Sequence, residues 1–352
     1  MTINHPFSSL ELPIIQAPMA GGITTPQMVI ETGRHGGLGM LAAGYLTPEN
    51  ALEQIREVKQ ALDKPFGINL FVPQPFHVDE ADVQKAEAAL APFSEALDLS
   101  GTATPPLPVY EKAVETFQAH IDVILEERVP VCSFTFGLPD AAATRRLKEN
   151  GVFLIGTATT TAEAVLVEES GMDMVVVQGS EAGGHRGHFH KSMEESHIGL
   201  FSLIPQTVDA VTIPVAAAGG IMDARGIQAA RCLGAAAVQM GTAFLPCQES
   251  GAPDAHKNAV LQAQEDDVVM TRAFSGKWAR GIQNEFIQMM KDEDAVVDFP
   301  VQNALTKPIR SAAGSRGDTA YMSLWTGQST RLARRRTVKE LMESLAEELK
   351  PF

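Results

Sequence analysis

The chain has 352 residues, of which 45% are hydrophobic, 20% are charged and 6% are aromatic, and its formal net charge is −15. This length and hydrophobic content suffice for a buried core and exclude global disorder. The net charge argues against general nucleic-acid binding and against docking on an anionic membrane, although a local pocket can still be positive.

Neither a disulfide framework nor a membrane segment is indicated. The three cysteines, Cys132, Cys232 and Cys247, lie far apart in the sequence, which is typical of a reducing compartment. Residues 1–6 show no basic start and no apolar signal core, and no stretch approaches ~18 uninterrupted apolar residues. We therefore expect a cytoplasmic protein.

Eight short apolar runs predict parallel strands, because strands that are buried on both faces read as continuous apolar segments. They cover residues 14–16, 38–42, 66–70, 131–134, 152–156, 174–178, 215–218 and 237–240. Helices are predicted between them at residues 48–62, 139–150, 161–170 and 223–233. Eight such units predict an α/β fold, a closed (β/α)₈ TIM barrel, with a doubly wound open sheet as the alternative.

Three segments are too long for the bare repeat. One lies between the third and fourth strands and contains an acidic, Ala-rich helix; the second follows the sixth strand. The third follows the eighth strand, with helices predicted at residues 284–291 and 328–349. Long insertions in barrels are typical of lids over the catalytic face. We expect residues 1–250 to form the barrel and residues 251–352 to form a helical lid or extension packed on it.

The loops after the seventh and eighth strands are rich in glycine. They read Ala218-Gly219-Gly220 and Gln239-Met240-Gly241-Thr242. Glycines let a phosphate approach backbone N–H groups, and these two loops form the habitual phosphate site of a TIM barrel. One Gly-Gly pair alone would indicate a tight turn. Two such loops in these positions favour a phosphorylated ligand or cofactor.

The sixth strand leads into the loop QGSEAGGHRG, residues 178–187. Its glycines would let the backbone pack against a flat ligand, and Gln178 could direct its amide at the edge of a heterocycle. His185 is the group here suited to proton transfer near neutral pH. A solvated polar loop is the alternative, but the position at a strand end favours a catalytic His185.

Further histidines follow at His188, His190 and His197. They could indicate a metal, but no Asp, Glu or Cys stands at a clear ligand spacing, and Lys191 lies among them. We therefore expect no metal site.

Two other strand ends carry residues suited to a ligand. The first strand leads into Ala17-Pro18-Met19, whose backbone could run along a planar ring, although a turn explains it equally well. Asn69 ends the third strand, where an amide in a barrel mouth needs a hydrogen-bond partner. A ring carbonyl or a ribityl hydroxyl would satisfy it.

Together these segments resemble the nitronate monooxygenases, formerly called 2-nitropropane dioxygenases. Six motifs occur in order, and none alone would identify the family. They are PIIQAPMAGG (13–22), GGLG (36–39), GINLF (67–71), QGSEAGGHRG (178–187), AAGGI (217–221) and QMGTAF (239–244). The resemblance covers residues 10–250 strongly and points to the bacterial class I type.

The resemblance implies an FMN-dependent (β/α)₈ barrel that oxidises alkyl nitronates with O₂ to a carbonyl compound and nitrite. It maps His185 onto the active-site histidine of the family. The cofactor contacts expected from the loops and the resemblance together are Ala17, Pro18, Met19, Asn69, Gln178, Gly183, Gly184, Gly219, Gly220, Gln239, Met240, Gly241 and Thr242. Residues 321–328 resemble a segment that closes the substrate pocket, which implies Tyr321 and Trp325 there, with core packing as the alternative for Trp325.

Sequence leaves the role of His185 open. It could take the α-proton of a neutral nitroalkane as a base, or hold the nitronate oxygens as a donor or a cation. Cations considered for an anionic substrate are Arg186, Lys277, Arg280, Lys307 and Arg310. A solvated surface position is the default expectation for each of them.

Other functions on the same barrel also stay open. They are an NAD(P)H:quinone reductase, an enoyl-thioester reductase and a non-catalytic flavin-binding protein, and His185 argues against the last. We expect a small nitronate and O₂ as partners, with no nucleic acid and no membrane. The oligomeric state is left open, a homodimer included.

Overall fold

The computed structural model describes residues 10–99, 101, 105–291 and 293–349; residues 1–6, considered above for a signal sequence, lie outside the described residues. Eight parallel strands form one sheet in the order β1-β9-β8-β6-β5-β4-β3-β2. A parallel bridge between Ile15 and Leu38 joins the two ends of this order. The sheet is therefore a closed (β/α)₈ barrel, as predicted, and the open-sheet alternative is wrong.

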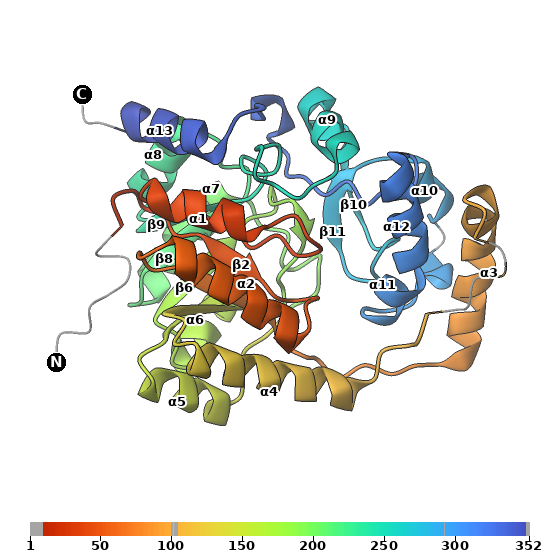
Figure 1. Ribbon diagram of the computed structural model, residues 1–352, viewed down its shortest axis with the longest axis horizontal. Helices are drawn as coiled ribbons and strands as arrows, with labels where there is room; N and C mark the ends of the chain where they lie inside the picture. The colour runs from red at the N-terminus through yellow and green to blue at the C-terminus, as the bar shows by residue number, and fades with distance from the viewer. Residues whose placement is uncertain (1–9, 100, 102–104, 292, 350–352) are drawn as a thin grey trace.

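The strands of the barrel match the predicted runs to within one or two residues. They are β1 (Ile14–Gln16), β2 (Met40–Ala42), β3 (Gly67–Phe71), β4 (Val131–Thr135), β5 (Phe153–Ala158), β6 (Met174–Gln178), β8 (Val215–Ala218) and β9 (Ala237–Met240). The surrounding helices are α1 (Pro26–Arg34), α2 (Pro48–Ala61), α4 (Tyr110–Glu126), α5 (Ala141–Glu149), α6 (Thr161–Glu169), α7 (Leu200–Ala210) and α8 (Ala224–Cys232). Figure 1 shows them around the strands.

Local signals fix the ends of these helices. Thr47 accepts a hydrogen bond from the Asn50 N–H and so caps α2, as predicted. Gly151, Gly171 and Gly234 follow α5, α6 and α8 with positive φ angles, which is the left-handed conformation that ends a helix at glycine.

The last helix, α13 (Val338–Glu348), begins ten residues later than predicted. Thr337 and Glu340 form a capping box that sets this start, and residues 330–332 form a separate 3₁₀ turn. The helix packs on α1, and Leu341, Met342 and Leu345 join the hydrophobic cluster of the barrel helices. It therefore takes the place of an eighth barrel helix.

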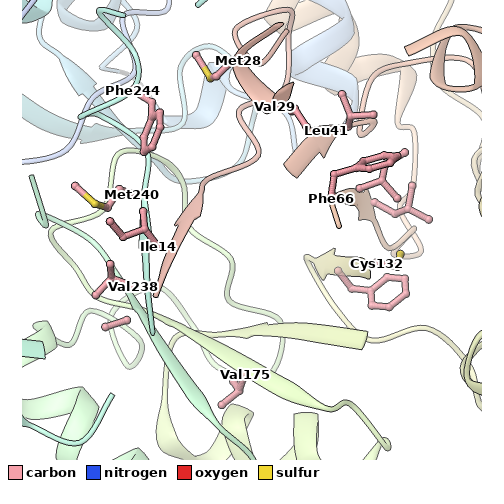
Figure 2. Close-up of a cluster of buried hydrophobic side chains, with 14 of the residues drawn as sticks. Ile14, Met28, Val29, Leu41, Phe66, Cys132, Val175, Val238, Met240 and Phe244 are labelled. Atoms are coloured by element: carbon pink, nitrogen blue, oxygen red, sulfur yellow. The ribbon is translucent and has the colours of Figure 1, made fainter. Parts of the chain in front are cut away.

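Strand alternation sorts the barrel side chains into two layers. Outward residues such as Ile14, Val175 and Val238 pack under the helices, in the cluster drawn in Figure 2. Inward residues such as Ile15 and Val176 fill the barrel. The same alternation decides which residues at the strand ends face the mouth of the barrel.

A second unit stands beside the mouth of the barrel (Figure 1). It contains the antiparallel sheet β10 (Val268–Thr271), β11 (Ala279–Ile282) and β7 (Gly184–His185). Its helices are α3 (Glu80–Ala96), α9 (Asp254–Gln262), α10 (Glu285–Met289), α11 (Val301–Leu305) and α12 (Lys307–Arg316), with a 3₁₀ turn at Glu293–Ala295. The 3₁₀ turn at Thr330–Leu332 contacts α9, and its Leu332 packs against the cluster of the barrel helices.

The unit has a hydrophobic cluster of its own. Val83, Leu90 and Phe93 of α3 pack with residues from 273–324, such as Phe274 and Phe286. Helix α3 and residues from 255–325 thus form one body, because Ala255, Ala259 and Trp325 also pack against this cluster. We call this body, with the adjoining residues 326–327, the lid region. The predicted division of the chain at residue 250 stays a prediction.

Candidate active site

A cavity of about 610 Å³ lies at the carboxyl ends of the barrel strands, where a TIM barrel places its active site. Inward residues of β3 to β9 form its floor: Asn69, Thr135, Thr157, Val176, Gln178, Ala218 and Gln239. The lid region supplies the other side, with residues from 274–275, 303–314 and 322–326. We call this space the mouth cavity.

Most of the predicted site residues line the mouth cavity. They are Ala17, Pro18, Met19, Asn69, Gln178, Gly183, Gly184, His185, Gly219, Gly220, Gln239, Gly241, Thr242 and Trp325. Segments far apart in the sequence are therefore brought together as expected.

Met240 and Tyr321 do not line it. Alternation along β9 turns the Met240 side chain outward, into the cluster of Figure 2, while Gln239 faces the cavity. The Tyr321 hydroxyl donates to Glu285 at 3.2 Å, and its ring meets Phe93 edge-on. Tyr321 therefore belongs to the packing of the lid region.

The two glycine loops present free backbone donors. The N–H groups of Gly220, Ile221, Gly241 and Thr242 bond to no acceptor in the described part of the chain. A Cβ atom at Gly241 would meet only Ala17 Cβ at 3.5 Å and Met19 Sδ at 3.8 Å, so the space beside it is open. Unpaired N–H groups beside open space fit the phosphate of a nucleotide cofactor.

Gly220 and Gly183 are glycines for additional reasons. Gly220 has a φ of +67°, which strains any other residue. At Gly183, a Cβ atom would lie within 2.4 Å of the Gly327 nitrogen, because the chain at 326–327 crosses this loop. Gly327 in turn donates to Thr242 Oγ1 at 2.9 Å, which ties the lid region to the β9 loop.

Gln178 holds the loop that carries His185. Its Nε2 donates to the His185 carbonyl at 3.0 Å, and its Oε1 accepts from the Gly187 N–H at 2.8 Å. Asn69 is similarly engaged, with Nδ2 donating to Ser133 Oγ at 2.8 Å and Thr135 Oγ1 at 3.1 Å. The protein therefore already holds both amides in place. A ligand could bond only to the donors and acceptors of Asn69 and Gln178 that these bonds leave unused.

His185 lies among aromatic rings. The nearest ring centroids are those of Trp325 at 5.5 Å, Phe136 at 5.9 Å and Phe299 at 6.2 Å. Its Nε2 is 2.8 Å from Ser275 Oγ. Burial, with a contribution from the positive charges of Lys277 and Arg310, lowers the pKa of the His185 imidazole to about 3. The ring is therefore neutral at pH 7.

Several residues of this wall were not predicted, Ser275, His256, Phe136 and Phe274 among them. Phe136 has a φ of +72°, an uncommon conformation for a bulky residue and one that recurs at ligand sites. His256 is buried, with Nε2 3.0 Å from the Trp325 carbonyl, and burial lowers its pKa to about 4. The motif FSGKWARG (274–281) carries no strand-end signal that would have found Ser275.

The candidate cations were expected to lie on the solvated surface, and this expectation is wrong for Arg186 and Arg280. Arg186 is fully buried and donates to the carbonyls of Gln178, Gly179 and Ser196. Arg280 is 4% exposed and donates to the Ser180 carbonyl. Carbonyl groups of the loop after β6 point toward these side chains, and one guanidinium can donate hydrogen bonds to several of them. Both side chains hold the fold of the loop after β6.

A larger cavity of about 1680 Å³ adjoins the first and shares Tyr45, Phe71, Phe136 and Asn303 with it. Lys277 and His188 line this outer cavity. The Lys277 ammonium lies 4.9 Å from the Phe136 ring centroid and donates to the His188 carbonyl at 3.4 Å. Across the described residues, no group of three or more His, Cys, Asp or Glu side chains could hold a metal ion.

The comparisons with known proteins agree over nearly the whole chain. The family model of nitronate monooxygenase matches residues 6–348. Probable nitronate monooxygenases of Staphylococcus aureus (strain MRSA252) and Staphylococcus haemolyticus are 45% and 47% identical, each over 97% of this chain and 95% of the relative.

Solved structures give the same picture. Nitroalkane oxidase from Streptomyces ansochromogenes superposes with a TM-score of 0.91 at 40% identity, covering 97% of both chains. FabK from Thermotoga maritima is more distant, with a TM-score of 0.74 at 31% identity over 96% of this chain and 93% of that one.

The fold and the site define a flavin-dependent oxidoreductase on a (β/α)₈ barrel. The chain belongs to the nitronate monooxygenase family. The chain is therefore an enzyme, as predicted. None of the described helices is long and apolar enough to be a transmembrane span.

Proposed function

We propose that this enzyme oxidises alkyl nitronates with O₂ to a carbonyl compound and nitrite, using non-covalently bound FMN. The observation that carries the proposal is a neutral histidine, His185, in the same cavity as two glycine loops with unpaired N–H groups. The names of the relatives support the substrate class.

FMN is proposed because the phosphate donors gather in one place, at Gly220, Ile221, Gly241 and Thr242. Ala17, Met19 and the floor residues would hold the ring and the ribityl chain. Bound FMN supplies the electron acceptor for the reaction. The protein has to hold the substrate, exclude water and handle the proton.

The hydrogen bonds around Ser275 indicate which nitrogen of His185 is basic. Ser275 Oγ is 3.1 Å from the Lys277 carbonyl, which can only accept, and we assign the single hydroxyl hydrogen to this bond. Ser275 Oγ then accepts from His185 Nε2–H. This leaves the lone pair on Nδ1, which bonds to no other group in the described chain.

Of the two roles considered for His185, a neutral imidazole with a free Nδ1 favours that of a base over that of a ligand for the nitronate oxygens. It can take the α-proton of a neutral nitroalkane, since it has no proton to donate from Nδ1. The nitronate anion that forms beside it offsets the cost of the new imidazolium charge in this buried site. A preformed nitronate, which has lost its proton, does not need this step.

Steady-state assays of the purified protein test the proposal. We expect O₂ consumption and nitrite release with ethyl nitronate, slower turnover of nitroethane, and no comparable turnover of NADH with a quinone or with an enoyl thioester. Chromatography of heat-released flavin should show FMN. Faster oxidation of NADH than of nitronate would overturn the proposed function, and released FAD would overturn the cofactor.

A further inference from the structure

Arg310 is the charged residue of the mouth cavity that the mechanism above leaves unused. It lies on α12, and its guanidinium is held from one side. Nε donates to Thr306 Oγ1 at 3.1 Å, and Nη2 donates to the carbonyl and the side-chain oxygen of Asn303 at 2.7 and 2.9 Å. Nη1 bonds to no acceptor in the described chain, so one edge of the fork stays available.

The charge of Arg310 has no carboxylate to balance it. No described Asp or Glu lies within 4.0 Å of its guanidinium, and the described lining of the mouth cavity contains neither residue type. Arg310 is also the one lysine or arginine in that lining. Burial lowers the pKa of Arg310, yet an arginine stays charged at neutral pH. The cavity is thus positive in a protein whose net charge is −15.

Arg310 is half-buried, and an uncompensated charge that faces an enclosed cavity is costly unless a ligand brings the opposite charge. With its proton assigned to Nε2, His185 presents a lone pair at Nδ1 and does not donate to an anion there. The other nearby cation, Lys277, lines the outer cavity, where it contacts Phe136 and His188. Arg310 is therefore the group in this cavity with both the charge and a free donor edge for an anion.

We propose that Arg310 forms an oxyanion subsite, in which Nη1 binds an oxygen of a small planar anion while His185 faces the α-carbon of the substrate. The anion is a nitronate as substrate and nitrite as product, an identity that rests on the proposed function. The subsite itself rests on the geometry of α12 and can be tested with nitrite alone.

Nitrite titration of the flavin-loaded enzyme, followed by flavin absorbance, measures the subsite directly. Arg310→Met should weaken nitrite binding about 10–100-fold, because a charge-assisted hydrogen bond is lost. KM for ethyl nitronate should rise by a similar factor, while KM for neutral nitroethane should change less than about threefold. Arg310→Lys, which keeps the charge without the fork, should lose affinity to an intermediate degree.

The matched control is Lys307→Met on the same helix, because this exposed lysine lines the outer cavity. It should leave nitrite affinity unchanged. Unchanged nitrite affinity in Arg310→Met, or an equal loss in Lys307→Met, would overturn the subsite. A re-tuned flavin spectrum with intact nitrite binding would also overturn it, because Arg310 would then serve the cofactor.

Thermal unfolding of each variant checks the packing of α12, and Arg310→Lys decides the question if Arg310→Met does not fold. Failure of the proposed function looks different. In that case no nitronate is turned over by the wild-type enzyme, while the nitrite titration still reports on Arg310.

Discussion

The glycine loops at 219–221 and 241–242 and the wall around His185 line the same cavity but are made differently. The glycine loops present backbone N–H groups, and their positions follow from the last strands of the barrel. The His185 wall is made of side chains that β7, β11 and the lid region bring together. In the proposed function, the backbone of the glycine loops holds the cofactor, and the side chains of the His185 wall contact the substrate.

This contrast makes a general forecast. Changes at the glycine loops should remove the cofactor and leave the fold intact. Changes at the His185 wall should leave the cofactor bound and slow the chemistry. Four experiments test the contrast, in order of expected effect.

The largest effect is expected for His185→Asn. Activity on a neutral nitroalkane should fall by a factor of about 10²–10⁴, because the base is lost, while turnover of a preformed nitronate is largely kept. Oxygen uptake with nitroethane and with ethyl nitronate measures both, and the flavin content should stay normal. His188→Asn is the control, since His188 lines the outer cavity. Wild-type kinetics of His185→Asn on both substrates would remove His185 from the mechanism.

Next is Gly241→Val, with flavin affinity expected to fall about 10–100-fold because the side chain occupies the approach to the free N–H groups. Gly241 is the better test than Gly220, since only Gly220 needs a positive φ. Gly241→Ala should show a smaller loss. Absorbance of the purified protein gives flavin occupancy, with Gly171→Asn as a distant control. Full occupancy in Gly241→Val would mean that no phosphate lies there.

Protonation of buried histidines gives the third effect. His256 is buried with a pKa of about 4, below the ~6.5 of an unfolded histidine, so the unfolded chain takes up the proton first as the pH falls. Stability should therefore be complete above about pH 6.5 and be lost toward pH 4, with His256 contributing about 2 kcal/mol of that loss by pH 5. Urea unfolding at pH 7 and pH 5 measures this, and His256→Gln should flatten the dependence. Equal pH dependence in both proteins would contradict the assignment.

The smallest effect is expected for Ser275→Ala, which removes the acceptor that orients His185. Loss of one neutral hydrogen bond should lower kcat for nitroethane about 3–10-fold and leave nitronate turnover unchanged. Ser323→Ala is the control, because Ser323 lines the same cavity and has no hydrogen bond to His185. Loss of nitronate turnover in Ser275→Ala would argue for a role other than orienting the base.

The sequence predicted the barrel and the glycine loops well because both have local signals. Apolar runs mark the strands, and Gly219-Gly220 and Gly241 follow two of them directly. The sequence predictions name no helix at α1 or α4, although both cover the barrel. The 3₁₀ turn at Thr330–Leu332 was also read as part of the final helix.

The His185 wall could not be predicted to the same depth. It depends on β7 pairing with β11, so that His185 stands opposite Ala279, and on Ser275 entering from the turn before that strand. Pairings between segments so distant, made by strands of two to four residues, leave no periodic pattern to read. Arg310 illustrates the same limit, since the sequence offers it as one of five candidate cations and nothing in its helix marks it, rather than the others, as a residue of the mouth cavity.

The packing of α3 against residues 273–324 has a consequence for synthesis on the ribosome. Val83, Leu90 and Phe93 leave the exit tunnel long before their partners Phe274 and Phe286 are made. At a translation rate of ~5–20 residues per second, this apolar face of α3 stays exposed for roughly 10–40 s before its partners are synthesised. The nascent chain is therefore most open to aggregation, and most in need of a chaperone, after most of the barrel has emerged and before the C-terminal third arrives.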